Sequence, residues 1–270
     1  MNMPFDEDAL RELELWPYLA LQRPATAIVD ATPDVAAPVV TAAETPRQAA
    51  PRATTDRRGV SAKSPVPAAV PSPAVVSDPA RAARIAALDW DGLQAEAANC
   101  QACGLCRQRK QAVLGVGARA APWLLVGEGP GAEEDEQGEP FVGQAGKLLD
   151  AMLAATGLQR GREVYIANVV KCRPPGNRTP SPEEALACAP LLDRQIELVQ
   201  PKLIVALGKT AVTRLTGSDA SMASLRGRLH DYRGIPLIAT YHPAYLLRNL
   251  PDKLKGWEDM MLAKKTMAGL

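Results

Sequence analysis

The sequence predicts an α/β protein: a three-layer α/β/α domain around a short, mainly parallel four-stranded central sheet, preceded by a disordered N-terminal extension. Two observations carry this prediction. Four short apolar runs rich in Val, Ile and Leu alternate with helical patterns, as in a parallel sheet with helices on both faces. The composition also changes sharply near residue 85, where a stretch rich in proline and alanine gives way to these runs.

The N-terminal extension is predicted to have two parts. Residues 1–21 contain leucines and a tryptophan near one helical face. This pattern fits either a frayed terminus or a short helix that docks on a partner protein through residues 5–21. Residues 22–84 are dense in proline, which removes backbone donors and interrupts helix and strand periodicity, so we expect a disordered linker there.

The folded domain is predicted to span residues 85–270. Its strands are expected to be continuous apolar runs because a parallel sheet covered on both faces buries both sides of each strand. Strands are predicted at 122–127, 163–169, 202–207 and 235–240, and helices at 86–98, 144–157, 182–200, 208–216 and 254–268. The helix at 182–200 has the clearest start, a serine cap followed by a proline and two glutamates.

Charge and composition exclude several broad classes. The formal net charge is only +1, so any binding to a polyanion must use a local basic patch. No apolar run approaches the length that spans a bilayer, and the first residues are acidic where a signal peptide is basic. We therefore expect a cytoplasmic monomer without membrane contact. In that reducing compartment, five cysteines favour metal ligation or core thiols over disulfides.

The tract Gly127-Glu128-Gly129-Pro130-Gly131 follows the first predicted strand. Glycines let the backbone approach a ligand closely, and open α/β sheets bind their ligands at such strand ends. The tract therefore predicts a ligand site that contains one carboxylate.

Four of the cysteines form two spaced pairs. Cys100 and Cys103 make a CxxC pair, whereas Cys172 follows a predicted strand and Cys188 lies in a predicted helix. Four thiolates brought together by the fold would suit either a zinc ion or a four-iron cluster. The alternative is that Cys172 and Cys188 are buried thiols and that the CxxC pair acts alone in redox chemistry. Cys106 is a fifth thiol near the first pair.

Taken together, the motifs resemble the family 4 uracil-DNA glycosylases, the iron–sulfur branch of that superfamily. The resemblance covers roughly residues 95–265. It rests on Asn99-Cys100-Gln101-Ala102-Cys103, on Gly127 to Asp135 with Pro140-Phe141-Val142-Gly143, on Asn168-Val169-Val170-Lys171-Cys172-Arg173-Pro174-Pro175, on Cys188, and on His242-Pro243-Ala244-Tyr245-Leu246-Leu247-Arg248.

The resemblance implies a DNA glycosylase that flips uracil out of single- or double-stranded DNA and hydrolyses the N-glycosidic bond. It leaves an abasic site and so initiates base excision repair. It also implies a 4Fe–4S cluster whose ligands are Cys100, Cys103, Cys172 and Cys188. Cys106 falls outside that ligand set.

The chemistry of base excision suggests a role for each motif residue. Phe141 would be an aromatic platform for the flipped base, and the Asn168 amide matches the donor and acceptor edge of uracil. His242 would donate to O2 of the departing uracil anion, with backbone amides near Gly129 and Gly131 as further donors. The alternatives are ordinary ones: a core phenylalanine, an asparagine that caps a turn and a histidine that caps a strand end.

Glu128 is expected to orient the attacking water or to stabilise positive charge on the sugar, and the sequence does not decide between these tasks. Other branches of the superfamily have an aspartate at the next position, where this chain has Gly129. DNA contacts are expected from Lys209, at a helix N-terminus, and from Leu246 and Arg248. A competing hypothesis is a non-catalytic iron–sulfur protein that binds DNA lesions or senses redox state.

Overall fold

A six-stranded sheet forms the centre of the computed structural model, which describes residues 78–270. The predictions for residues 1–77, including the docking helix and most of the linker, lie outside this part of the chain. The strand order is β1-β3-β2-β4-β6-β5. The strands are β1 (Val116–Gly117), β2 (Trp123–Gly127), β3 (Val164–Asn168), β4 (Leu203–Leu207), β5 (Leu229–Tyr232) and β6 (Ile235–Thr240).

The four predicted strands are β2, β3, β4 and β6, and all their mutual pairings are parallel. The prediction of only four strands was wrong, because β1 and β5 add antiparallel edges. Neither edge strand has the continuous apolar run that identified the others. β1 is two residues long, and β5 is partly exposed and includes His230 and Asp231.

Helices cover both faces of the sheet, which confirms the three-layer architecture. The α-helices are α3 (Pro79–Ala86), α4 (Trp90–Asn99), α5 (Ala132–Gln137), α6 (Gln144–Ala155), α7 (Pro182–Val199), α8 (Lys209–Thr216), α9 (Met222–Leu225), α10 (Pro243–Arg248) and α11 (Lys253–Ala268). Short 3-10 helices lie at Gly104–Arg107, Pro175–Asn177 and Leu250–Asp252. None of the helices between residues 78 and 270 is long and apolar enough to span a bilayer.

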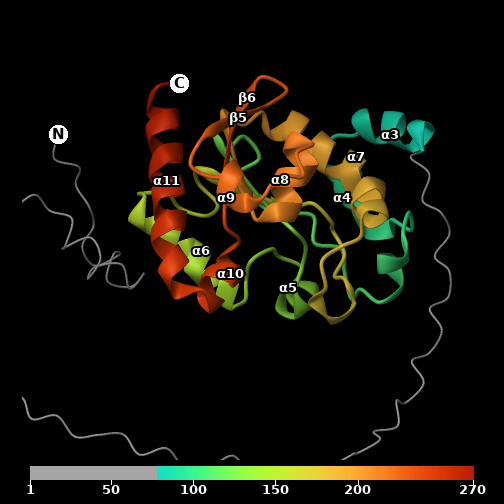
Figure 1. The fold of residues 1–270 in the computed structure, drawn as a ribbon. Helices are drawn as coiled ribbons and strands as arrows, with labels where there is room; N and C mark the ends of the chain where they lie inside the picture. The colour runs from blue at the N-terminus through green and yellow to red at the C-terminus, as the bar shows by residue number, and fades with distance from the viewer. Residues whose placement is uncertain (1–77) are drawn as a thin grey trace, which may run out of the picture. The chain divides into compact units, whose positions relative to one another are not determined.

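Alternate residues of the central strand β2 supply the two cores. Leu124 packs with α4, α7 and α8, whereas Leu125 packs with α6, α10 and α11, and both side chains are fully buried. This follows from strand geometry, because successive side chains point to opposite faces. Figure 1 shows α6, α10 and α11 gathered on one side and α3, α4 and α7 on the other.

The folded part begins before the predicted boundary at residue 85. Asp78 caps α3 by accepting a hydrogen bond from the Arg81 amide, and Ile85 within the helix is fully buried. The predicted helix at 86–98 corresponds to α4, which starts four residues later, and α3 precedes it as a separate helix. Asp89 starts the second one by accepting from the Gly92 amide, so the chain turns between α3 and α4.

The parallel strands end at one edge of the sheet. Gly127 at the end of β2 pairs with Asn168 at the end of β3, and Leu207 of β4 pairs with Thr240 of β6. The segments that follow these strands therefore meet at the same edge, where open α/β sheets bind ligands.

Candidate active site

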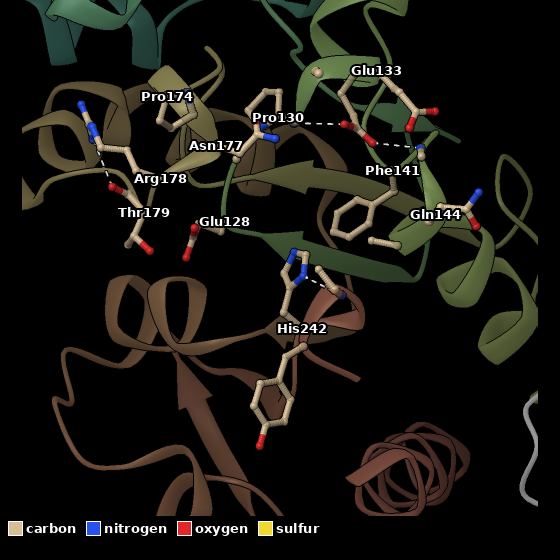
Figure 2. Close-up of a pocket in the computed structure, with 18 of the residues that line it drawn as sticks. Glu128, Pro130, Glu133, Phe141, Gln144, Pro174, Asn177, Arg178, Thr179 and His242 are labelled. Carbon is tan, nitrogen blue, oxygen red and sulfur yellow. Dashed lines mark hydrogen bonds between the residues drawn. The ribbon is translucent and has the colours of Figure 1, made fainter. Parts of the chain in front are cut away.

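A cavity of about 530 Å³ opens at this edge of the sheet. Its walls come from the glycine tract after β2, from the segment around Phe141, from residues 174–179 and from α10. The predicted site residues that line it are Glu128, Gly129, Gly131, Phe141, His242 and Arg248. Figure 2 shows Glu128, Phe141 and His242 facing the same space.

Glu128 directly follows β2 and is half-buried. Its main-chain oxygen accepts from the Val170 amide, which extends the pairing of β2 and β3 beyond the strands. Its carboxylate Oε2 accepts from the Thr210 hydroxyl at 2.5 Å. The carboxylate is therefore held at the cavity by a residue from α8, which the sequence gave no reason to place there.

Phe141 adopts a left-handed backbone conformation, with φ of 56°. This region is unfavourable for a bulky residue, so the surrounding structure must hold it. Arg160 donates to the carbonyl oxygens of Pro140 and Phe141, each at 2.7 Å. Gly146 approaches the Phe141 carbonyl so closely that a β-carbon would collide with it.

Glu134 joins the glycine tract to the Phe141 segment. Its carboxylate accepts from the backbone amides of Gly131, Val142 and Gly143, each at 3.0 Å. The Gly131 amide is consequently occupied, which corrects the expectation that it donates to substrate. Sequence reasoning missed both Glu134 and Arg160, because their partners are main-chain atoms that leave no pattern in the residue types.

His242 caps the N-terminus of α10 through its ring. The Ala244 amide donates to Nδ1 at 3.1 Å, so Nδ1 carries no proton and a neutral ring bears its proton on Nε2. Burial, helped by the positive charge of Arg248, lowers the pKa of His242 to about 4. The ring also stacks on Phe141, with centroids 5.4 Å apart. Near neutral pH, His242 is thus an uncharged donor through Nε2.

Asn168 ends β3 and is only 1% exposed, and it does not line the cavity. Its Oδ1 has no hydrogen-bond partner within the described residues. A β-carbon on Gly127 would collide with both this oxygen and the Phe141 ring, which locates the amide beside them. An unsatisfied buried acceptor costs on the order of 1–3 kcal/mol, so the free Oδ1 points to a ligand partner.

The five cysteines surround a second, small cavity between α4, the 3-10 helix at Gly104–Arg107 and α7. It is lined by Cys100, Cys103, Cys106, Cys172 and Cys188 together with Arg109 and Lys171. Between residues 78 and 270, no three His, Cys, Asp or Glu side chains form a group that could hold a metal ion. The fold nevertheless brings both predicted pairs to one cavity, which Cys106 also lines.

Cationic groups and amides point at these sulfur atoms. Arg81 donates to Cys100 Sγ at 3.3 Å, and Arg109 donates to Cys172 Sγ at 3.0 Å. The Lys171 amide donates to Cys188 Sγ at 3.3 Å. Burial raises the pKa of Cys103 to about 11, so as a free thiol it stays protonated.

Comparison with known proteins identifies the family. Residues 114–262 match the Uracil DNA glycosylase superfamily. A type-4 uracil-DNA glycosylase from Thermotoga maritima is 49% identical over 58% of this chain and 82% of its own length. The chain belongs to the type-4 uracil-DNA glycosylases. Type-4 relatives from Pyrobaculum aerophilum (46% identical, 56% of this chain and 80% of the relative) and Archaeoglobus fulgidus (42%, 58% and 82%) agree.

The three residues expected to contact DNA occupy different environments in this type-4 glycosylase. Arg248 lines the cavity, so it is placed for such a contact. Lys209 does not line the cavity, and its ammonium donates to the Ala220 carbonyl at 2.6 Å and pairs with Asp219. Leu246 is 1% exposed and packs in the core under α10, so the expectation that it touches DNA was wrong.

Leu247 is the exposed neighbour, with 40% of its surface accessible. The helical turn of α10 decides which of the two leucines faces outward, because adjacent residues on a helix point in directions about 100° apart. The two leucines are chemically identical, so nothing in the motif itself distinguished them.

Proposed function

We propose that this protein is a uracil-DNA glycosylase that removes uracil from DNA by hydrolysis and leaves an abasic site. The observation that carries the proposal is the cavity in which the Glu128 carboxylate, the Phe141 ring and the neutral His242 imidazole face one another. Family membership supports the same reaction. Because a base stacked in a duplex cannot reach such a cavity, the nucleotide must be flipped out.

Recognition of uracil is assigned to Phe141 and Asn168. The Phe141 ring offers an apolar surface at the cavity wall. The Asn168 amide can accept from uracil N3–H through its free Oδ1 and donate to O4 through Nδ2, whereas cytosine presents the reverse pattern. Since Asn168 is almost fully buried, a neighbouring side chain must shift when the base enters.

Bond cleavage is assigned to His242 and Glu128. Breaking the N1–C1′ bond leaves negative charge on uracil O2 and positive charge on the sugar. The Nε2–H of His242 can donate to O2 as the charge develops, in the manner of an oxyanion-hole donor. The Glu128 carboxylate can stabilise the sugar cation or orient the attacking water, and both tasks require its negative charge.

The test is single-turnover release of uracil from single-stranded and duplex oligonucleotides, with thymine in place of uracil as the control substrate. The wild-type protein is expected to release uracil and leave alkali-sensitive abasic sites. Glu128→Gln keeps the size of the side chain but removes its charge, so it should be slow. Binding to uracil-containing DNA without any release would instead support the non-catalytic lesion-binding hypothesis.

A 4Fe–4S cluster held by Cys100, Cys103, Cys172 and Cys188 is the cofactor that we propose. Such a thiolate-bound cluster carries net negative charge. The surroundings suit an anion, because Arg81 and Arg109 donate to the sulfurs. Lys171 adds a buried positive charge: it is 1% exposed, and within the described residues its ammonium donates only to the Asn168 carbonyl. When bound, the cluster would cross-link the segment after α4 to the segments around β3 and α7.

Iron and acid-labile sulfide analysis of anaerobically purified protein tests this cofactor. We expect about four irons per chain, with loss of iron on Cys172→Ser and full iron content in Cys106→Ser. Because Cys106 lines the same cavity, it is also the matched control for thiol removal. Stoichiometric zinc without iron would contradict the proposal.

A further inference from the structure

The turn that connects β4 to α8 touches both proposed catalytic side chains. It consists of Gly208 and is followed by Lys209 and Thr210, the first two residues of α8. The sequence Gly208-Lys209-Thr210 resembles the end of a phosphate-binding loop but lacks the required upstream glycine. Gly208 has φ of +87°, and a β-carbon there would lie 2.9 Å from His242 Cβ. Its amide donates to the Thr240 carbonyl at 2.8 Å, which ties the turn to the strand that leads to His242.

We propose that Thr210 is a positioning residue that orients the Glu128 carboxylate for catalysis; the inference rests on the proposed role of Glu128. The Thr210 hydroxyl donates to Oε2 at 2.5 Å across 82 positions of sequence. In the described part of the chain, this is the only hydrogen bond that the Glu128 side chain makes. Oε1 therefore remains free to act on water or on the sugar.

Other threonines of α8 show what an ordinary helical threonine does. Thr213 donates to the Ser218 carbonyl at 3.1 Å, and Thr216 donates to the Val212 carbonyl at 2.7 Å. These are local bonds to the main chain, as is usual for hydroxyls in helices. Thr210 instead donates to a carboxylate on another strand end, so its hydroxyl serves the site rather than its own helix.

Orientation matters because Glu128 has three rotatable side-chain bonds and directly follows β2 in a glycine-rich tract. A reacting group must be held close to its productive geometry, and small misplacements cost large factors in rate. A charge-assisted hydrogen bond is among the stronger means of holding a carboxylate. Thr210 provides this hydrogen bond from the first turn of α8, next to Gly208, whose backbone lies close to His242.

The test compares Thr210→Val, which keeps the shape of the side chain but removes the donor, with Thr210→Ser, which restores it. Thr213→Val on the same helix is the matched control. Single-turnover uracil release should fall roughly 10- to 100-fold in Thr210→Val, as for a lost hydrogen bond to a charged group. It should remain near the wild-type rate in Thr210→Ser and Thr213→Val. Binding to an uncleavable uracil analogue should not change in any of them.

A double variant separates positioning from a general structural effect. In the Glu128→Gln background, Thr210→Val should cause no further loss, because the carboxylate on which it acts is absent. A full additional loss, or wild-type turnover by Thr210→Val, would overturn the inference while leaving the glycosylase function intact. Wild-type turnover by Glu128→Gln would overturn it as well. If the wild-type protein itself releases no uracil, the proposed function fails instead.

Discussion

The ionisation state of His242 gives the most direct test of the proposed mechanism. With a pKa of about 4, roughly one ring in a thousand is protonated at pH 7, whereas an unperturbed histidine would be about one quarter protonated. The catalytic donor is thus a neutral imidazole with its proton on Nε2. Accordingly, the rate of uracil release should show no change attributable to this ring between pH 5.5 and 8.

Ring nitrogen and carbon chemical shifts measured by NMR report this state directly. The chain has only two histidines, so a His230→Gln variant assigns the signals. We expect the His242 signal to stay in the neutral form, protonated at Nε2, until the pH approaches 4. Because folding lowers the pKa of His242, the unfolded chain takes up a proton before the folded chain does as the pH falls from about 6.5 towards 4. Protonation of this residue therefore reduces the stability of the folded state over that range.

Replacing the ring measures its contribution to the rate. His242→Ala should slow the chemical step by roughly 10²–10³, the usual effect of losing one oxyanion-hole donor. Binding to DNA should barely change, because phosphate contacts dominate affinity. A His242 titration near pH 6.5, or wild-type turnover by His242→Ala, would refute the reasoning.

Three further predictions concern selectivity, positioning and domain boundaries. Asn168→Asp should reduce the stabilisation of the transition state for uracil excision by about 2–4 kcal/mol, because the carboxylate cannot donate to O4. Single-turnover kinetics on uracil and cytosine substrates measure this loss. Arg160→Ala should slow uracil release by roughly 10-fold, because Phe141 loses the clamp on its strained backbone. Deletion of residues 1–77 should preserve excision and the melting temperature, whereas deletion of residues 1–87 should lower both, because it removes α3.

A control or a contradicting result is defined for each of these predictions. Arg162→Ala is matched to Arg160→Ala, since Arg162 is exposed and its nearest carboxylate, on Glu163, lies 3.8 Å away. Uracil excision by Asn168→Asp at the wild-type rate would remove that residue from base recognition. Wild-type melting after deletion of residues 1–87 would contradict the packing of Ile85, which is fully buried.

Local sequence patterns determined which segments form the central strands and which of their residues are buried. The apolar runs of β2, β3, β4 and β6 predicted both their strand character and their burial, because a strand covered on both faces must be apolar throughout. The motifs after β2 and β6 likewise predicted that Glu128 and His242 lie near each other, since parallel strands end at the same edge. Phe141, between α5 and α6, was assigned to the site by the family resemblance, and it does line the same cavity.

Tertiary structure alone decided which atoms these residues contact. The sequence of β5 shows no strand pattern of its own, and β5 is a strand because it pairs antiparallel with β6. Leu246 and Leu247 differ only in the side of α10 that they occupy, and Glu128 meets Thr210 only because α8 starts beside β2. Such contacts join residues distant in sequence through hydrogen bonds and packing that place no constraint on the intervening residues, so only the folded chain reveals them.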